Sequence, residues 1–265
     1  MGALFDTQAF YVYEPSSTET AYTAASGDSL VNRFFNAPAT SSLIAFDRQG
    51  VTKGVYRLRS PLMYDNVKGI HIAVSGGQTI FELPAVGVQP FYSQDTLILE
   101  GTGETGAYDL VTMTRYYSNF QGSDMRLYSW GTIAPLIVNL YEIEIATTST
   151  ATPVAWTDTV VTTTENLLKA NTDHAVLGYT VDVALGGIAI KGADTSNFRY
   201  GGPGLLNSPF TADFFCRIGQ LTGMAAIPVI NSANVGNTFV STIDTGDATS
   251  ANVTLHLAQL VRNLS

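Results

Sequence analysis

Charge is scarce in this sequence. Only 13% of the 265 residues are charged, against roughly 25% in an average soluble domain. Apolar residues make up an ordinary 45%, so Thr, Ser, Gly and Asn stand where charge is missing. Disordered chains are poor in apolar residues and rich in charge, so we expect a folded chain. A low-charge, Thr-rich surface indicates an exterior that is largely covered by neighbouring chains.

Basic residues are few as well. The chain has 13 Lys and Arg against 22 Asp and Glu, which gives a net charge of −9. The basic residues are scattered singly along the sequence. Phosphate backbones and anionic lipid surfaces both require clustered Lys and Arg. Direct binding to nucleic acid and electrostatic adhesion to a membrane are therefore disfavoured.

Cysteine and export signals are almost absent. Cys216 is the single cysteine, which excludes an internal disulfide and a cysteine-based zinc site. Its neighbours Phe214 and Phe215 predict a buried strand with a core thiol. No basic residue precedes Arg33, and no apolar run approaches the roughly 18 residues of a membrane span. We expect a chain that is made in the cytoplasm and does not cross a membrane.

Alternation of apolar and polar residues is the dominant pattern in the sequence, and it predicts an all-β fold. Within Leu136–Ile145 the apolar positions change face midway, which predicts either a β-bulge or a strand that is buried on both faces at one end. Short helices are expected at Gly27–Asn36 and Thr163–Ala170. The predicted strands are Val55–Leu58, Gly69–Val74, Thr96–Glu100, Leu110–Arg115, Leu136–Ile145, His174–Val183, Gly187–Lys191, Ala212–Ile218, Ala225–Ile230, Thr238–Ile243 and Asn252–Val261.

A change of composition divides the chain. Residues 146–153 are rich in Thr and Ala and lack large apolar side chains, as is typical of a connection between domains. Strands separated by Gly-rich turns are typical of a sandwich or barrel. We therefore predict an N-terminal arm at 1–39, a first β domain at 40–150, a linker at 151–164 and a second β domain at 165–265.

Two weak internal matches support a tandem pair of similar domains. Residues 68–72 match residues 186–190 at an offset of about 118, and the strand Leu136–Ile145 matches Asn252–Val261 at an offset of about 115. Repeated units with a fixed offset are typical of duplicated architectures.

Candidate chemistry is sparse. The segment Gly101–Gly106 has the spacing G-x-G-x-x-G, but a strand follows it where a nucleotide-binding loop needs a helix, so we interpret it as a hairpin turn. The histidines His71, His174 and His256 each lie in a predicted strand without a second His at metal-ligand spacing. We expect them to be packing residues.

Carboxylates offer two further hypotheses. Glu142 and Glu144 lie on one face of a predicted strand and are the candidates for a glycosidase acid pair; a solvated face or a contact between subunits is the favoured interpretation. Asp244 and Asp247 lie in a short loop and provide too few oxygen ligands for Ca²⁺ by themselves. No catalytic residue, metal or cofactor is predicted, and we expect a protein that is not an enzyme.

The sequence resembles the double jelly-roll major capsid proteins of tailless, lipid-containing icosahedral bacteriophages. The residues that carry the resemblance are Phe198–Gly204, the predicted strand Phe210–Ile218, and Ile227–Asn234. The resemblance implies two eight-stranded jelly rolls, and a homotrimer of pseudo-hexagonal outline in a virion shell assembled in the host cytoplasm. The implied partners are the chain itself, neighbouring capsomers, other virion proteins and a nearby internal membrane. The arm at 1–39 would then lie over a neighbouring subunit or along the shell interior.

Two other functions remain open on the sequence. A viral spike, decoration or tail protein that binds a host receptor would have a similar composition. Tyrosine is frequent, with 13 residues against 2 Trp, and exposed Tyr serves both protein interfaces and sugar-binding faces. A carbohydrate-binding β-sandwich is therefore the alternative from a different class.

Overall fold

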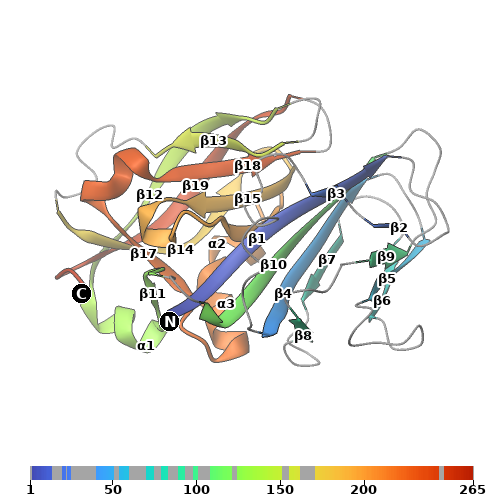
Figure 1. Ribbon diagram of the computed structural model, residues 1–265. Coiled ribbons are helices and arrows are strands. Elements are labelled where there is room, and N and C mark those ends of the chain that lie inside the picture. Colours follow the sequence, from blue (N-terminus) through green and yellow to red (C-terminus); the bar gives the residue numbers. More distant parts are fainter. Residues whose placement is uncertain are drawn as a thin grey trace.

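The structure is a computed structural model of the chain (Figure 1). It describes residues 124–150, 155–161, 171–244 and 248–264, except the side chains at 221 and 222. Before residue 124 it describes the strands named below, with side chains only at residues 4–7 and 114. The predicted helices Gly27–Asn36 and Thr163–Ala170 lie outside the described residues. No helix within the described ranges is long and apolar enough to span a bilayer.

The C-terminal half contains two antiparallel sheets. Their neighbour orders are β11-β17-β14-β19-β12 and β13-β18-β15-β16. Strand bounds in the first sheet are β11 Leu127–Tyr128, β12 Ile137–Thr148, β14 Asp173–Val181, β17 Ile227–Asn231 and β19 Ser250–Leu260. Those in the second are β13 Thr157–Val160, β15 Leu185–Lys191, β16 Tyr200–Gly204 and β18 Phe239–Ile243.

The order of these strands is that of a jelly roll. If β12 to β19 are numbered from one to eight along the chain, the sheets have the orders 6-3-8-1 and 2-7-4-5. This arrangement arises when a long hairpin rolls into two facing sheets. The short strand β11 is added beside β17 at the edge of the first sheet.

The N-terminal half repeats this order. Its sheets are β3-β1-β10-β4-β7, with β8 also pairing with β4, and β2-β9-β5-β6. If the two-residue strand β3 beside β1 is left out and β7 and β8 share position six, the same numbering gives the orders 1-8-3-6 and 2-7-4-5. The bounds are β1 Gly2–Tyr13, β2 Thr20–Ala21, β3 Thr23–Ala24, β4 Thr40–Gly50, β5 Gly54–Arg59, β6 Ile70–Val74, β7 Thr79–Glu82, β8 Gln89–Tyr92, β9 Ile98–Glu100 and β10 Tyr108–Phe120.

The all-β prediction is confirmed, but the pairing corrects where strands belong. The segment expected to be an arm contains β1, which pairs along its length with β10. The strand expected to close the first domain, β12, pairs with β19 instead. The expected linker contains β13. Pairing therefore changes from one half to the other between β10 and β11, because sheet partners are chosen by long-range packing and not by local composition.

The two internal matches do not join equivalent strands. Residues 70–72 lie in β6, at position five of the first half, whereas 186–190 lie in β15, at position four of the second. Strands β12 and β19 are neighbours in one sheet. The repeat is real in topology, while the similarities that suggested it come from the common alternation of strands.

One predicted strand is a pair of helices. Residues predicted as the strand Ala212–Ile218 form the end of α2 (Pro209–Ala212) and most of α3 (Phe214–Thr222). Ser208 caps α2 by accepting a hydrogen bond from the backbone N–H of Phe210 at 3.2 Å. Gly223, with φ of 69°, ends α3 in the left-handed conformation that favours glycine. The apolar residues of this short run fit both the strand period and the helix period. The capping residues Ser208 and Gly223 favour the helices.

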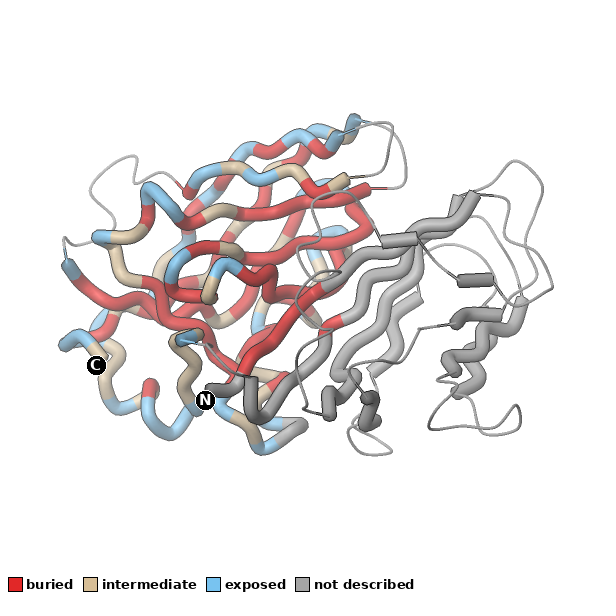
Figure 2. Tube along the Cα trace, viewed as in Figure 1, coloured by how far each residue is buried: buried red, intermediate tan, exposed pale blue. Residues whose placement is uncertain are grey.

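Helix α3 contributes the aromatic centre of the core. Phe214 and Phe215 are buried beside Tyr179 and Tyr200, with ring centroids 4.7 Å apart for Phe215 and Tyr200. Figure 2 shows buried residues running through both sheets of the C-terminal half. The remaining short elements are α1 Trp130–Ile133, η4 Ala134–Leu136, η5 Ala193–Thr195 and η6 Ser232–Asn237.

Candidate assembly surface

The two jelly rolls meet along β1 and β16. Leu4, Phe5, Asp6 and Thr7 are consecutive and all buried. Because alternate residues of a strand point to opposite faces, β1 is covered on both faces at this point. The ring of Phe5 stacks on that of Tyr200 at 4.5 Å, with 14° between the planes. One face of β1 thus belongs to its own jelly roll, and the other packs on the second.

Hydrogen bonds fix this junction. The backbone oxygen of Gly201 accepts from the hydroxyls of Thr7 at 2.9 Å and Thr114 at 2.6 Å. The backbone N–H of Thr7 donates to the oxygen of Arg199 at 2.7 Å. Strands β4 and β10 also contact β15 and β16. The outer face of the β1–β10–β4 sheet therefore covers β16, the edge strand of its sheet.

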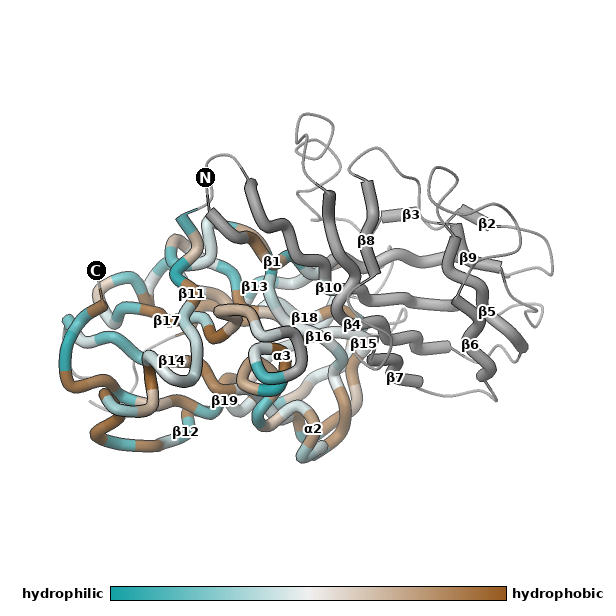
Figure 3. Tube along the Cα trace, turned by 90° about the horizontal axis from the view of Figure 1, so that it is seen from below, coloured by the Kyte–Doolittle hydropathy of each residue, from teal (hydrophilic) through white to brown (hydrophobic). Residues whose placement is uncertain are grey.

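The corresponding sheet of the second jelly roll is exposed on the outer face of its edge strand β12, whereas α2 packs on β14 at Gly178. On β12, Ile143, Ile145 and Thr147 are buried, whereas Leu140, Glu142 and Glu144 are exposed. Leu140 is 62% exposed and Val138 is 57% exposed, both unusual for large apolar side chains. A register shift lies between Ile137 and Asn139, near the start of β12. Pairing is continuous at Leu140 and Tyr141, where the face change was expected, because Leu140 is exposed and does not compete for the core face. Figure 3 shows β12 at the periphery of the described half.

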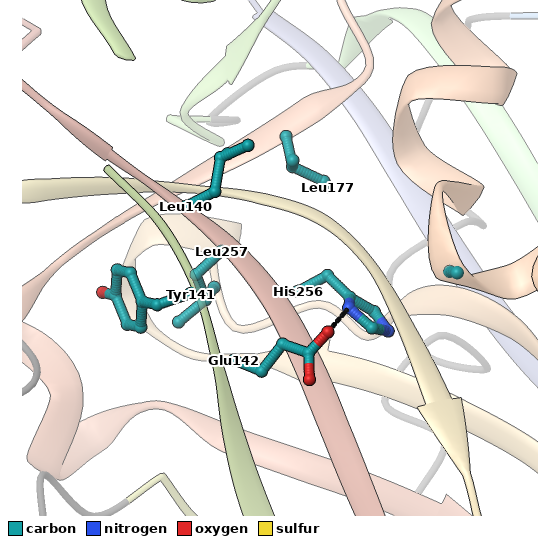
Figure 4. Close-up of a pocket in the computed structure, with 7 residues that line it drawn as sticks. Leu140, Tyr141, Glu142, Leu177, His256 and Leu257 are labelled. Carbon is teal, nitrogen blue, oxygen red and sulfur yellow. Dashed lines mark ion pairs between the residues drawn. The ribbon is translucent and has the colours of Figure 1, made fainter. Parts of the chain in front are cut away.

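A pocket of about 510 Å³ lies on this face (Figure 4). Its lining includes Leu140 and Leu177, with Ala212 of α2 at one side. Within it, the Glu142 carboxylate lies 3.0 Å from Nδ1 of His256. The Nε2 atom of His256 is 3.2 Å from the hydroxyl of Thr180. The pocket combines an acidic group, an imidazole and exposed apolar surface.

The structure describes some of the carboxylates that the sequence analysis considered. Glu142 and Glu144 do share one face of β12, as predicted, and both are exposed. Asp244 accepts a hydrogen bond from the Thr249 hydroxyl at 2.5 Å, while Asp247 and Gly101–Gly106 lie outside the described residues. Within the described ranges, no three His, Cys, Asp or Glu side chains gather as metal ligands would.

The remaining residues considered in the sequence analysis are two histidines and the single cysteine. His174 is buried, and its Nδ1 is 2.5 Å from the hydroxyl of Tyr141. Burial raises the pKa of Tyr141. Burial, followed by the nearby charge of Asp213, raises the pKa of the Cys216 thiol to about 11. His71 lies in β6, where the side chains are outside the described set.

An ionic cluster at the other end of the sandwich was not predicted. Arg126, just after the junction between the halves, binds the buried carboxylate of Asp173 through two hydrogen bonds of 2.6 and 3.1 Å. It also reaches Asp194 at 3.4 Å and the backbone oxygen of Leu264 at 2.6 Å. These residues are far apart in the sequence, and no local pattern joins them. The cluster ties the connecting segment and the C-terminus to the second jelly roll.

Comparisons with known proteins give only distant likenesses. No protein-family model and no curated protein matches the chain. A solved structure described as the atomic structure of Sulfolobus Turreted Icosahedral Virus aligns over 99% of this chain and 81% of its own, at 8% identity and a TM-score of 0.28. The major capsid protein P2 from bacteriophage PM2 aligns over 97% of both chains, at 7% identity and a TM-score of 0.24.

A third structure, described as a triple jelly roll fold in an archaeal virus, aligns over 98% of this chain and 58% of its own, at 9% identity and a TM-score of 0.27. All three TM-scores are below 0.5, so these similarities are too low to assign a function to this chain. The functional conclusion therefore depends on strand order and on the surface of this chain.

Proposed function

We propose that this chain is a structural subunit of an icosahedral virus shell, with two jelly rolls per chain and three chains per pseudo-hexameric capsomer. The observation that carries the proposal is the same jelly-roll strand order in both halves of one chain. Jelly rolls serve in viral capsids, lectins and cupins. Two of them joined through a buried junction give a single rigid block, and three such blocks supply six similar units around a ring.

The surface chemistry supports this choice. A shell subunit needs extensive side-by-side contacts, and obligate interfaces commonly bury about 2,000 Å² or more. Only 13% of the residues are charged, and Val138 and Leu140 are exposed on a long edge strand. An exposed edge strand has unpaired backbone N–H and C=O groups, which can pair with a strand of another chain. A soluble monomer would gain nothing from it.

In this role the fold performs no chemistry. The junction at β1 and β16 holds the two jelly rolls in fixed orientation, and the outer faces provide the contacts to neighbours. The partners are other copies in the same capsomer, adjacent capsomers and other virion proteins, beside an internal membrane. The chain is assembled in the host cytoplasm and resides in the virion.

Electron microscopy of the concentrated, purified protein tests the proposal. A shell subunit is expected to form flat sheets or closed shells of six-sided units as concentration rises. A spike or decoration protein would remain as discrete small oligomers, and a lectin would bind sugars on a glycan array while staying dispersed. Either of these results would overturn the shell assignment.

A further inference from the structure

We propose that the outer face of β12 and β19 in one copy binds strands β5 and β6 of a second copy, head to tail. This inference rests on the proposed shell function and names the surface that joins subunits within a capsomer. Within a single chain, the outer face of β1 and β10 contacts the strands β15 and β16 of the other jelly roll.

Each partner of that internal contact has an equivalent in the other jelly roll. Strands β12 and β19 occupy positions one and eight of the second jelly roll, as β1 and β10 do in the first. Strands β5 and β6 occupy positions four and five of the first, as β15 and β16 do in the second. By strand position, a chain therefore has a second copy of each partner surface. Unequal surfaces that meet head to tail generate a ring when the rotation closes.

Residues on the two equivalent faces can be matched through a register shift that both sheets contain, opposite Thr114 and Arg115 of β10 and opposite His256 and Leu257 of β19. Thr7 is opposite Thr114 across β1 and β10, and Glu142 is opposite His256 across β12 and β19. The first pair is buried against Gly201 in the junction. The second pair contacts itself at 3.0 Å, with the Glu142 side chain 64% exposed. The position that is covered in the first jelly roll is thus open in the second.

Apolar positions correspond in the same way. Phe5 precedes Thr7 by two residues and packs on Tyr200 of β16. Leu140 precedes Glu142 by two residues, lies on the same face and is 62% exposed. The pocket of about 510 Å³ beside Leu140 is large enough to receive an inserted side chain, as the junction receives Tyr200.

Charge selects β5 and β6 as the occupant. The open face carries the exposed carboxylates Glu142 and Glu144. Strand β5 contains Arg57 and Arg59, and Arg57 pairs in register with His71 of β6. Neither strand contains an acidic residue; Glu100, which pairs with Arg57, lies in β9. A basic pair of strands is complementary to the acidic face, and complementarity of this kind favours correct partner choice.

Zero-length cross-linking tests the contact directly. Lys53 lies just before β5 and Lys68 just before β6, so a carbodiimide is expected to couple one of these amines to Glu142 or Glu144. We would mix ordinary and ¹⁵N-labelled full-length protein and identify the coupled peptides by mass spectrometry. Mixed-isotope pairs between these sites support the contact between copies. Oligomers whose cross-links all lie elsewhere would overturn it.

Variants separate this inference from the proposed function. Leu140→Asp is expected to weaken self-association at least about tenfold, measured by native mass spectrometry over a dilution series. Val160→Asp, at a partly exposed position on the other sheet, is the matched control and is expected to associate like the wild type. Circular dichroism of both variants establishes that the fold is retained.

Charge reversal gives a second, independent readout. Glu142→Lys with Glu144→Lys is expected to weaken association, and adding Arg57→Glu with Arg59→Glu is expected to restore it. A wild-type chain that forms trimers unaffected by Leu140→Asp and by charge reversal would refute the surface while leaving the shell function intact. A wild-type chain that stays monomeric at all concentrations would instead refute the shell function itself.

Discussion

Gly201 lies in β16, where the two jelly rolls meet, and it also packs closely against β15, its neighbour in the same sheet. A Cβ atom at this position would lie 2.0 Å from the backbone oxygen of Ile188 and 2.5 Å from the Cα of Ala189. The same residue exchanges hydrogen bonds with Thr7 through both its N–H and its oxygen. Glycine is therefore needed here for close approach of two backbones and not for turn geometry.

Gly201→Ala is expected to lower the free energy of unfolding by about 3 kcal/mol, because backbone must move to admit the methyl group. Gly236→Ala is the control, since a Cβ there meets nothing within 4 Å. Urea denaturation of both variants measures the difference. Equal stability of the two would show that β15 and β16 approach each other less closely than described.

Two buried or partly buried aspartates of the second jelly roll make the free energy of unfolding depend on pH. Burial alone would raise the pKa of Asp173, but hydrogen bonds from Arg126, Leu264 and Asn231 outweigh it and lower the pKa. The same balance lowers the pKa of Asp158, through Lys191, Ser241 and Arg199. A carboxyl with a lowered pKa stabilises the fold above its unfolded-state pKa. That contribution is lost as pH falls below about 4.

Asp173→Asn is expected to destabilise the protein by about 3 kcal/mol at neutral pH, because it removes the charge that Arg126 binds in a buried site. The variant is also expected to lose less stability on acidification than the wild type does. Asp213→Asn is the control: its pair with Arg217 is exposed, so a change within about 0.5 kcal/mol is expected. Thermal melts between neutral and acidic pH measure both effects, and parallel curves for wild type and Asp173→Asn would contradict the assignment.

At the scale of elements, β1 is integral to the fold. It pairs with β10 from Gly2 to Tyr13 and buries Leu4 and Phe5. Deletion of residues 1–13 is therefore expected to abolish cooperative folding, whereas removal of a draped arm would leave a folded subunit. Thermal melting and size-exclusion chromatography of the truncated chain measure this. A soluble truncated chain with an unchanged melting temperature would restore the arm interpretation.

Helix α3 protects the single thiol. Cys216 is partly buried within it, and its pKa is raised to about 11. Because the thiolate is the reactive form, alkylation by iodoacetamide near pH 8 is expected to be more than tenfold slower in the native protein than in guanidinium. A mass-spectrometric time course measures the rates. Equal rates would indicate that α3 opens readily.

The sequence predicted the positions of the strands better than it predicted which strands pair with each other. Alternation predicted β12, β14, β18 and β19 at nearly their observed positions. The helix at 214–222 was missed because a short apolar run fits both periods. Pairing of β12 with β19 could not be predicted, since their partners are about a hundred residues apart. For the same reason, the sequence placed Glu142 on a strand face but could not place His256 opposite it.

At the scale of the whole molecule, the two jelly rolls contact each other once, and each contact surface has a second copy by strand position. The internal junction buries Phe5 and Tyr200, whereas Leu140 on β12 is exposed. This difference between the two faces is the physical basis of the proposed assembly of copies into a ring.

The mass of the purified wild-type chain in dilute solution tests this account most directly. Native mass spectrometry, at concentrations low enough to exclude larger shells, is expected to give a species of three 28.3 kDa chains. Retention of a monomer of intact fold across the dilution series would contradict the account.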